Sequence, residues 1–424
     1  MGRAEVLDTY RRHVNKTSAI LADLIAAPLE VSSLGTKVYD EHGNAYLDCG
    51  GYAVFLLGHR HPAVVAAVHR QLDLHPLATR LLPSPPLAEA AETLAGVAPR
   101  GLDHVFLTNS GAEATELGLK LARLGGRTRV VAMDGGFHGK TMGALSITGR
   151  AQYRTPFAPL LPDVEFVPFG DAGALDRALA EDGARTCVVL EPVQGEGGVI
   201  IPPPGYLRHA REVCSRTGAL LMADEIQTGL GRLGRWWGVD AEGVVPDLLL
   251  VGKILSGGVV PVGAVIATDE VFAPLDADPL LHSSTYAGNP LAAVAATETV
   301  RVIEREGLVE RAASLGRTLL AMTTDVLTTH CPGLVRDVRG EGLLIGIEFA
   351  APDLAAEFMI ALLEERVITS YSLNTHTVLR LTPPAVLDRD DLCFLESALT
   401  AAARNLAHRN RTTLPTPEVS SCAP

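Results

Sequence analysis

The chain has 424 residues, 47% of them hydrophobic, so it can bury a substantial core, which excludes disorder over most of its length. Its net charge of −13, with no block of five or more Lys or Arg, argues against a surface that binds nucleic-acid phosphates or anionic lipid. Six scattered cysteines without CxxC spacing, a charged N-terminus and no apolar stretch long enough to span a bilayer predict a cytoplasmic protein with reduced thiols and no membrane contact.

Short apolar runs alternate with helical patterns between about residues 102 and 267. Runs rich in Val, Leu and Ile are typical of a mostly parallel sheet that helices cover on both faces. The sequence therefore predicts an α/β fold with a large domain built on seven strands. We expect these strands at Val105–Thr108, Val130–Met133, Glu165–Pro168, Cys187–Leu190, Ala219–Ala223, Asp247–Val251 and Val262–Ala267.

The two ends of the chain predict a second, smaller α+β domain. A turn signal between Val38–Asp40 and Tyr46–Asp48 indicates a hairpin. Leu308–Leu327 has a helical pattern, and Gly342–Phe349 reads as a strand. We expect residues 1–50 and 301–409 to form the small domain together, residues 51–300 to form the large one, and residues 410–424 to be a flexible tail.

Lys253 differs from the other four lysines because it lies between two apolar runs. A lysine in that position loses hydration, which lowers the pKa of its ammonium group and frees the amine to act as a nucleophile or base. Covalent chemistry with a carbonyl group is the natural use of such an amine. The pattern is equally compatible with a lysine at a strand end whose head reaches water.

Asp224 directly follows the apolar run Ala219–Ala223. Ligands of open α/β sheets bind outside the carboxyl ends of the strands, so Asp224 and Lys253 are expected to face one crevice. This pair suits pyridoxal phosphate, whose aldehyde forms a Schiff base with a lysine and whose ring nitrogen is kept protonated by a carboxylate. The alternative for Asp224 is a helix N-cap.

A phosphate site is expected at Ser110, Gly111 and Ala112, between the strand Val105–Thr108 and the helical pattern Glu113–Leu124. The backbone amides of Gly111 and Ala112 would lie at a positive helix N-terminus, and the hydroxyl of Ser110 could add a donor. Any capped helix start looks similar, so this motif alone is weak evidence.

Taken together, these segments resemble the class III (omega) aminotransferases, a family of pyridoxal-phosphate enzymes of fold type I. The resemblance covers the chain from about Leu34 to Leu387, with its motifs in the family's order. They are Gly58–Pro62, Asn109–Glu113, Phe137–Thr141, Glu191–Gly198, Asp224–Gly229, Gly252-Lys253, Ser284–Pro290 and Val338–Leu343.

The resemblance implies a role for each matching position. Lys253 would carry the Schiff base, Asp224 would pair with the pyridine nitrogen, and Gly111 and Ala112 would bind the phosphate. The other expected cofactor contacts are Ser110, Phe137 stacked on the ring, His138, Ile226, Gln227 near the phenolic oxygen, and Thr285 on the phosphate of the neighbouring subunit's cofactor. The last contact implies a homodimer with active sites at the subunit interface. Without the resemblance, Phe137 would read as a core aromatic.

The resemblance also implies how substrates are recognised. Arg380 would bind the carboxylate of 2-oxoglutarate, because a guanidinium binds a carboxylate through two hydrogen bonds, and Glu196 would pair with Arg380 when an amine substrate lacks that carboxylate. Several stretches look closest to putrescine (diamine) aminotransferases, with Tyr52 and Phe55 on the donor side. Tyr52 and Phe55 could equally be packing residues, and Arg380 could belong to a structural ion pair.

The expected reaction is a ping-pong transfer of a terminal amino group from a small amine to 2-oxoglutarate. Acetylornithine, ornithine and 4-aminobutyrate, or an amine of secondary metabolism, are alternative donors. Three other functions are alternatives. An aminomutase or racemase would use the same lysine, and a catalytically inactive homologue would keep the fold. A nicotinamide oxidoreductase is suggested by the GxGxxG match Gly229–Gly234, but this match does not run from a strand directly into a helix.

Overall fold

The computed structural model describes residues 1–79 and 81–410, and its centre is a seven-stranded sheet. The strand order is β4-β10-β9-β8-β7-β5-β6. Neighbours from β9 to β6 run parallel, whereas β10 is antiparallel to both β9 and β4. The strands are β4 (His104–Thr108), β5 (Arg129–Met133), β6 (Val164–Val167), β7 (Thr186–Leu190), β8 (Leu220–Asp224), β9 (Leu248–Val251) and β10 (Gly263–Ala267). This confirms the predicted α/β class and the mostly parallel sheet.

Helices cover both faces of this sheet, which explains the continuous apolar runs. In β9, Leu248 and Leu250 pack on the side of α5 (Gly111–Leu124), whereas Leu249 and Val251 join the cluster that contains α9 (Tyr206–Thr217). Successive side chains of a strand point to opposite faces, so a strand covered on both sides must be apolar at every position. α10 (Asp269–Ala277) adds to the first face, and α8 (Ala172–Leu179) and α11 (Pro290–Arg305) add to the second.

Two four-stranded sheets are built from the ends of the chain, the first from both ends and the second from the C-terminal part alone. One has the order β1-β2-β3-β13, and the other has the order β11-β12-β15-β14. The hairpin of β2 and β3 is the predicted one, and β13 lies parallel to β3, which joins the N-terminal and C-terminal parts. The strands are β1 (Glu30–Leu34), β2 (Lys37–Asp40), β3 (Ala45–Asp48), β11 (Val335–Glu341), β12 (Leu344–Phe349), β13 (Val367–Ile368), β14 (Ser370–Tyr371) and β15 (Val378–Leu381).

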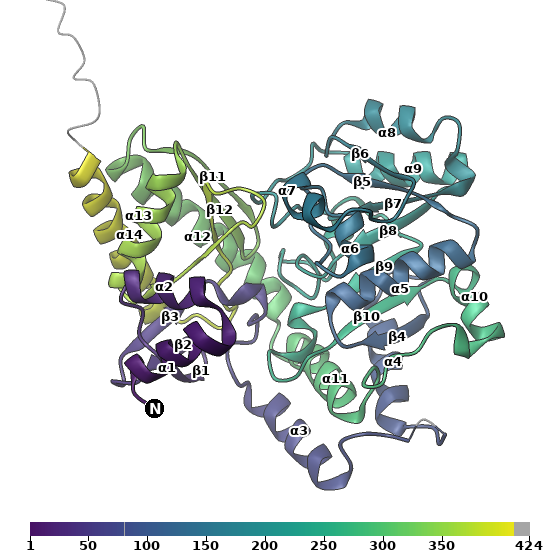
Figure 1. Cartoon of the computed structure of the whole chain (residues 1–424), viewed down its shortest axis with the longest axis horizontal. Coiled ribbons are helices and arrows are strands. Elements are labelled where there is room, and N and C mark those ends of the chain that lie inside the picture. The colour runs from purple at the N-terminus through teal and green to yellow at the C-terminus, as the bar shows by residue number, and fades with distance from the viewer. Residues whose placement is uncertain (80, 411–424) are drawn as a thin grey trace, which may run out of the picture.

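The remaining helices complete two regions, which Figure 1 shows side by side, the seven-stranded sheet on the right. We propose that the left region is the small domain expected from both ends of the chain. The helices there and at the junction are α1 (Arg3–Thr9), the π-helix η1 (Tyr10–Val14), α2 (Lys16–Leu24), α3 (Pro62–Leu74), α12 (Leu308–His330), α13 (Pro352–Glu364) and α14 (Arg389–Asn410). On the right, α4 is Pro85–Val97, α6 is Met142–Ser146 and α7 is Ala151–Arg154.

Within residues 1–79 and 81–410, no helix combines the length and the apolar character needed to cross a membrane. The tail expected at residues 410–424 lies outside the described residues beyond Asn410, which ends α14.

Candidate active site

A cavity of about 230 Å³ lies where the parallel strands of the large sheet end. Its walls come from the N-terminus of α5 and from the loops that follow β5, β7, β8 and β9. This is the edge at which open α/β sheets bind their ligands. The lining residues are Gly111, Ala112, Phe137, His138, Gly139, Glu191, Glu196, Asp224, Ile226, Gln227 and Lys253.

Lys253 opens the short 3₁₀ helix η6 (Lys253–Ser256), immediately after β9 and Gly252. Its backbone has φ of 45°, a left-handed conformation that a non-glycine residue adopts only where its surroundings enforce it, often at active sites. Burial lowers the pKa of the Lys253 amine, the charge of Arg380 lowers it further, and the charge of Glu196 acts against this shift. More of this amine is therefore neutral near pH 7 than in an exposed lysine.

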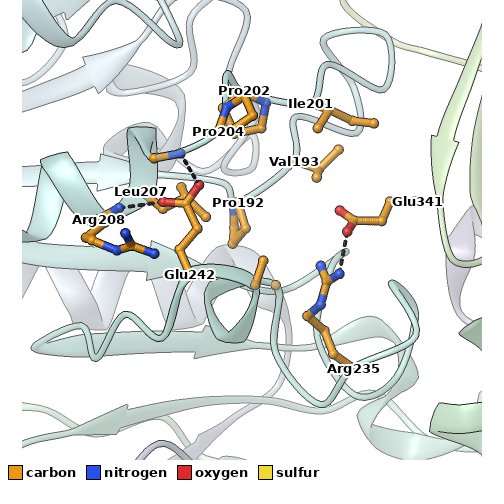
Figure 2. A pocket seen from close by; sticks show the side chains of 13 residues that line it. Pro192, Val193, Ile201, Pro202, Pro204, Leu207, Arg208, Arg235, Glu242 and Glu341 are labelled. Atoms are coloured by element: carbon orange, nitrogen blue, oxygen red, sulfur yellow. Dashed lines mark hydrogen bonds and ion pairs between the residues drawn. The ribbon is translucent and has the colours of Figure 1, made fainter.

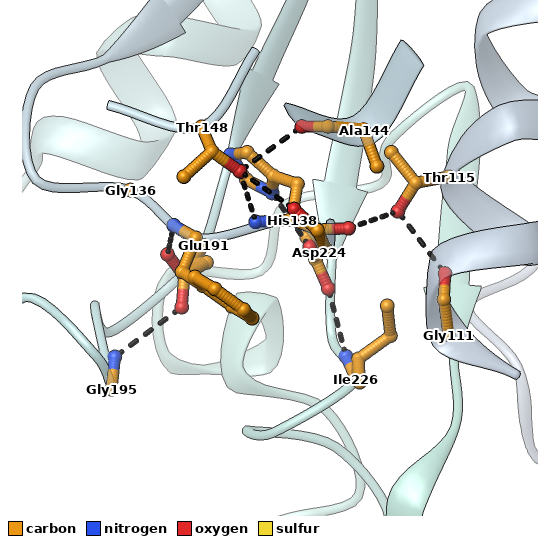
Figure 3. Close-up of polar contacts among 12 residues, drawn as sticks. Gly111, Thr115, Gly136, His138, Ala144, Thr148, Glu191, Gly195, Asp224 and Ile226 are labelled. Carbon is orange, nitrogen blue, oxygen red and sulfur yellow. Dashed lines mark hydrogen bonds and ion pairs between the residues drawn. The ribbon is translucent and has the colours of Figure 1, made fainter. Parts of the chain in front are cut away.

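Asp224 ends β8 and is hydrogen-bonded to His138 in the interior. The distance from Asp224 Oδ2 to His138 Nδ1 is 2.6 Å, and Oδ1 accepts the amide of Ile226 at 3.1 Å. Burial alone would lower the pKa of His138, but the hydrogen bond to Asp224 and the charges of Asp224 and Glu191 raise it overall. The pair therefore places the Asp224 carboxyl group at the cavity wall with a hydrogen bond to a histidine whose pKa is raised (Figure 3).

The loop that carries Phe137 and His138 is fixed from several sides. The His138 amide donates to Thr148 Oγ1 at 3.2 Å, and its carbonyl accepts the hydroxyl of Thr115 at 2.9 Å. Glu191, directly after β7, accepts the Phe137 amide at 2.9 Å and the Gly195 amide at 3.3 Å (Figure 3). The aromatic ring of Phe137 is thus placed in the cavity by a rigid support.

Glu191 also lines the cavity, and no role was expected for it from the sequence. Burial raises its pKa, and the nearby charge of Asp224 raises it further, whereas the charge of His138 lowers it. The signal that could have found Glu191 is its place in the chain, because it follows strand β7 as Asp224 closes strand β8.

The predicted gate residues meet at one side of the cavity. Arg380 on β15 donates from Nη1 to Glu196 Oε1 at 2.6 Å and to Gln227 Oε1 at 3.1 Å. All three side chains are buried. The Nε2 amide of Gln227 has no hydrogen-bond partner within the described part of the chain, so a donor is left for a ligand oxygen.

The expected phosphate site lies at the start of α5, two residues earlier than the helical pattern predicted. Ser110 is its N-cap, with Oγ accepting the Glu113 amide at 3.2 Å. The first amides of a helix have no acceptor within the helix, so those of Gly111 and Ala112 can bind an anion. A Cβ atom at position 111 would come within 2.8 Å of Ile226 Cδ1, so a larger residue there would force the Ile226 side chain to move.

Five predicted site residues do not line this cavity. Ser110 caps α5 beside it and Arg380 pairs with the lining residue Glu196, whereas Tyr52, Phe55 and Thr285 make no such contact. Tyr52 is 82% exposed, and the ring of Phe55 stacks on buried His59 with 3.7 Å between ring centroids. Thr285 is exposed on the loop before α11, as a contact with another subunit would require. The roles of Tyr52, Phe55 and Thr285 stay predictions.

A larger cavity of about 650 Å³ lies beside α9, but it is a poorer candidate. Its carboxylates are already engaged, because Glu341 pairs with Arg235 at 2.5 Å and Glu242 accepts the amides of Gly205 and Arg208 (Figure 2). Its described lining contains no lysine, histidine, cysteine or serine. Nucleophilic chemistry is therefore better supported at the strand-end cavity.

The GxGxxG match forms no dinucleotide site. Residues 226–235 follow β8 as turns and bends, and the next helix in the chain is a short 3₁₀ helix at Gly238–Glu242. Arg232 within the match is completely buried and donates to backbone carbonyls of Ala53 and Pro383. A phosphate-binding fingerprint would instead lead from the strand directly into a helix.

The donor set of the strand-end cavity fits pyridoxal phosphate. The cavity is surrounded by a half-buried amine with a lowered pKa, a carboxyl group hydrogen-bonded to a histidine, an aromatic ring and a helix N-terminus, and Gln227 offers a buried donor without a partner in the described part of the chain. Together with the α/β sheet, these features define a pyridoxal-phosphate-dependent enzyme of fold type I.

Comparison with known proteins gives the family. The model of the class-III aminotransferases matches residues 27–402, so the chain belongs to this family, whose members use pyridoxal phosphate. A solved ornithine aminotransferase from Toxoplasma gondii ME49 is 31% identical, with 98% of this chain and 97% of that chain covered and a TM-score of 0.88.

Omega-transaminases are similar as well. An (S)-enantioselective omega-transaminase from Thermomicrobium roseum is 28% identical, with 96% of this chain and 99% of that chain covered and a TM-score of 0.87. A transaminase from the marine bacterium Virgibacillus is 26% identical, with the same shares covered and a TM-score of 0.88. The protein is therefore a pyridoxal-phosphate-dependent class III aminotransferase.

Proposed function

We propose that this aminotransferase moves the terminal amino group of a diamine or omega-amino compound, such as putrescine, to 2-oxoglutarate. The observation that supports this proposal is the buried ion pair of Glu196 and Arg380 beside Lys253. While Glu196 neutralises the charge of Arg380, the site can accept an amine that has no carboxylate. Once Glu196 turns away, Arg380 can bind the carboxylate of a keto acid.

Each residue contributes a defined step. Bound pyridoxal phosphate supplies an aldehyde carbon that bonds to amines and a ring that accepts electrons. Lys253 would hold the cofactor through its amine, and the same amine would serve as the base and then the acid that moves the proton of the amine-bearing carbon. Asp224, hydrogen-bonded to His138, would hold the ring nitrogen of the cofactor. Phe137 would pack on the ring, and Gln227 would supply a hydrogen-bond donor to it.

We propose a homodimer in which Thr285 contacts the phosphate of the partner subunit's cofactor. Its support is the exposed loop at Thr285, whose neighbour Tyr286 is 62% exposed. A mixed dimer of Lys253→Ala and Thr285→Ala chains tests this arrangement. One of its two sites would combine intact Lys253 with intact Thr285 of the partner, and activity above either parent is expected.

Replacement of Arg380 by lysine is expected to reduce kcat/KM for 2-oxoglutarate by about 10- to 100-fold, because an ammonium cannot bind a carboxylate through two parallel hydrogen bonds. The half-reaction with a carboxylate-free diamine should change by less than about threefold. Stopped-flow absorbance of the two half-reactions measures both effects. Equal losses in the two half-reactions would contradict the gate.

An ornithine-type activity is the second candidate, because the ornithine aminotransferases of Toxoplasma gondii are similar over almost the entire chain. A screen of putrescine, cadaverine, ornithine, acetylornithine and 4-aminobutyrate for glutamate formation distinguishes the donors. The putrescine proposal fails if ornithine is turned over with a far higher kcat/KM than any diamine.

A further inference from the structure

The segment Ser372–Asn374, here called the strap, begins the connection from β14 to β15 and holds Glu196 from one side. The Leu373 amide donates to Glu196 Oε2 at 2.8 Å, and the Asn374 amide donates to the Glu196 carbonyl at 3.0 Å. Two consecutive amides of the strap therefore bind both the side chain and the backbone of Glu196, the glutamate of the proposed gate.

The strap also bonds to the segment before Phe137 and to the neighbour of Glu196. Asn374 Nδ2 donates to the Gly135 carbonyl at 2.7 Å, just before the Phe137 loop, and Ser372 Oγ donates to the Gly195 carbonyl at 3.3 Å. Ser372 is fully buried and Asn374 is 4% exposed, so water does not compete for these bonds. Movement of the strap would therefore displace both Glu196 and the segment that carries Phe137.

The two oxygens of Glu196 have different partners. Oε1 accepts from Arg380 and Oε2 accepts from the Leu373 amide. An amide that donates to a charged carboxylate makes a stronger hydrogen bond than one between neutral groups, so the strap keeps Glu196 directed at Arg380. For Glu196 to leave Arg380, this second bond must also break or rotate.

An outer anchor holds the strap in place. The hydroxyl of Tyr153, on α7, donates to the Leu373 carbonyl at 2.6 Å, so both polar groups of residue 373 are bonded. Tyr153 is only partly buried and lies outside the cavity lining. It therefore offers a mild way to loosen the strap without changing the cavity.

We propose that the strap is the positioning element of the gate, which holds Glu196 on Arg380 and so sets the balance between amine and keto-acid recognition. This inference rests on the gate in the proposed function. Loosening the strap removes part of the hold on Glu196, so Arg380 becomes more available to a carboxylate and less suited to an amine that lacks one.

The direct test compares Leu373→Pro, which removes the amide donor, with Leu373→Ala, which keeps it. In the holoenzyme, Leu373→Pro should lower kcat/KM of the diamine half-reaction by about five- to tenfold, and glutarate, a dicarboxylate that cannot react, should bind about three- to fivefold more tightly. Leu373→Ala should stay within about twofold of the parent in both measurements. Calorimetry gives the glutarate Kd without turnover.

Tyr153→Phe is the second variant, because a proline at position 373 could prevent folding. It should change both quantities in the same directions by about two- to threefold. Tyr46→Phe is its matched control, since the Tyr46 hydroxyl faces Asp40 in the N-terminal sheet. Proportional losses in both half-reactions, or glutarate binding that does not tighten, would overturn the inference.

Glu196→Ala separates failure of the strap from failure of the gate. If Glu196→Ala binds glutarate more tightly but neither strap variant does, the gate stands and the strap inference is wrong. If Glu196→Ala itself leaves glutarate binding unchanged, the gate is wrong and the strap inference falls with it.

Discussion

Replacement of Lys253 by alanine is expected to lower the rate of amino-group transfer by at least about 10³-fold while the fold survives. Lys253 lies in the strand-end cavity, and burial lowers the pKa of its amine, so a neutral nucleophile and base is lost. Lys253 lies in the short helix η6 and is not among the buried residues of the core, so little of the surrounding packing depends on its side chain. Single-turnover absorbance changes with donor amine and with 2-oxoglutarate measure the loss.

The same position can be tested without turnover. Borohydride reduction of the holoenzyme followed by peptide mapping should place the cofactor on Lys253, and the alanine variant should give no adduct. Lys16→Ala is the matched control, because Lys16 is exposed at the start of α2 and should not affect the rate. A reduced adduct on another lysine, or retained turnover in Lys253→Ala, would refute the assignment.

The sheet could be predicted from the sequence because its physical requirement is local. A strand covered on both faces needs an apolar residue at every position, and the run Leu248–Val251 satisfies this by itself. The positions of Asp224 and Lys253 then follow from topology, since both stand where strands end and β8 is the neighbour of β9. The chemical roles of Asp224 and Lys253 can therefore be predicted from their residue types and from their positions after the two strands.

The rest of the site depends on contacts between distant segments, which no local sequence pattern can predict. Glu191 acts through the backbone amides of Phe137 and Gly195, which any sequence would supply, and only the folded chain brings them to its carboxylate. The strap is similar, because its bonds to Glu196 also come from backbone amides. The meeting of Glu196 and Arg380 was expected only from the family resemblance, because they lie in segments far apart in the sequence.

The residues expected on the donor side show a further reason why parts of the site could not be predicted from the sequence. Tyr52 and Phe55 were expected to line it only from the resemblance to putrescine aminotransferases, and the exposure and packing of a side chain are tertiary properties. Tyr52 has φ of 52° and projects outward, and Phe55 instead packs on His59. Neither residue lines the strand-end cavity, so their contact with the donor amine stays a prediction.

Replacement of Asp224 by asparagine is expected to lower kcat by about 10²- to 10³-fold and to weaken cofactor binding. The substitution keeps the shape of the side chain but removes the negative charge that faces the cavity. It also removes the main influence that raises the pKa of His138, so burial would then favour a neutral imidazole. Kinetics of the two half-reactions and the Kd of pyridoxal phosphate, from fluorescence titration, measure the two effects.

The adjacent residue supplies a matched control. Glu225 is also buried, but its carboxyl group accepts from the Thr228 hydroxyl and, at 2.9 Å, from the Val239 amide, and it does not line the cavity. Burial raises the pKa of Glu225 to about 7, so its neutral form is already populated at neutral pH and glutamine imitates it. Glu225→Gln should therefore bind the cofactor and react like the parent. Similar losses in Asp224→Asn and Glu225→Gln would show that any uncharged substitution at this strand end disturbs the site, and would contradict a specific charge at Asp224.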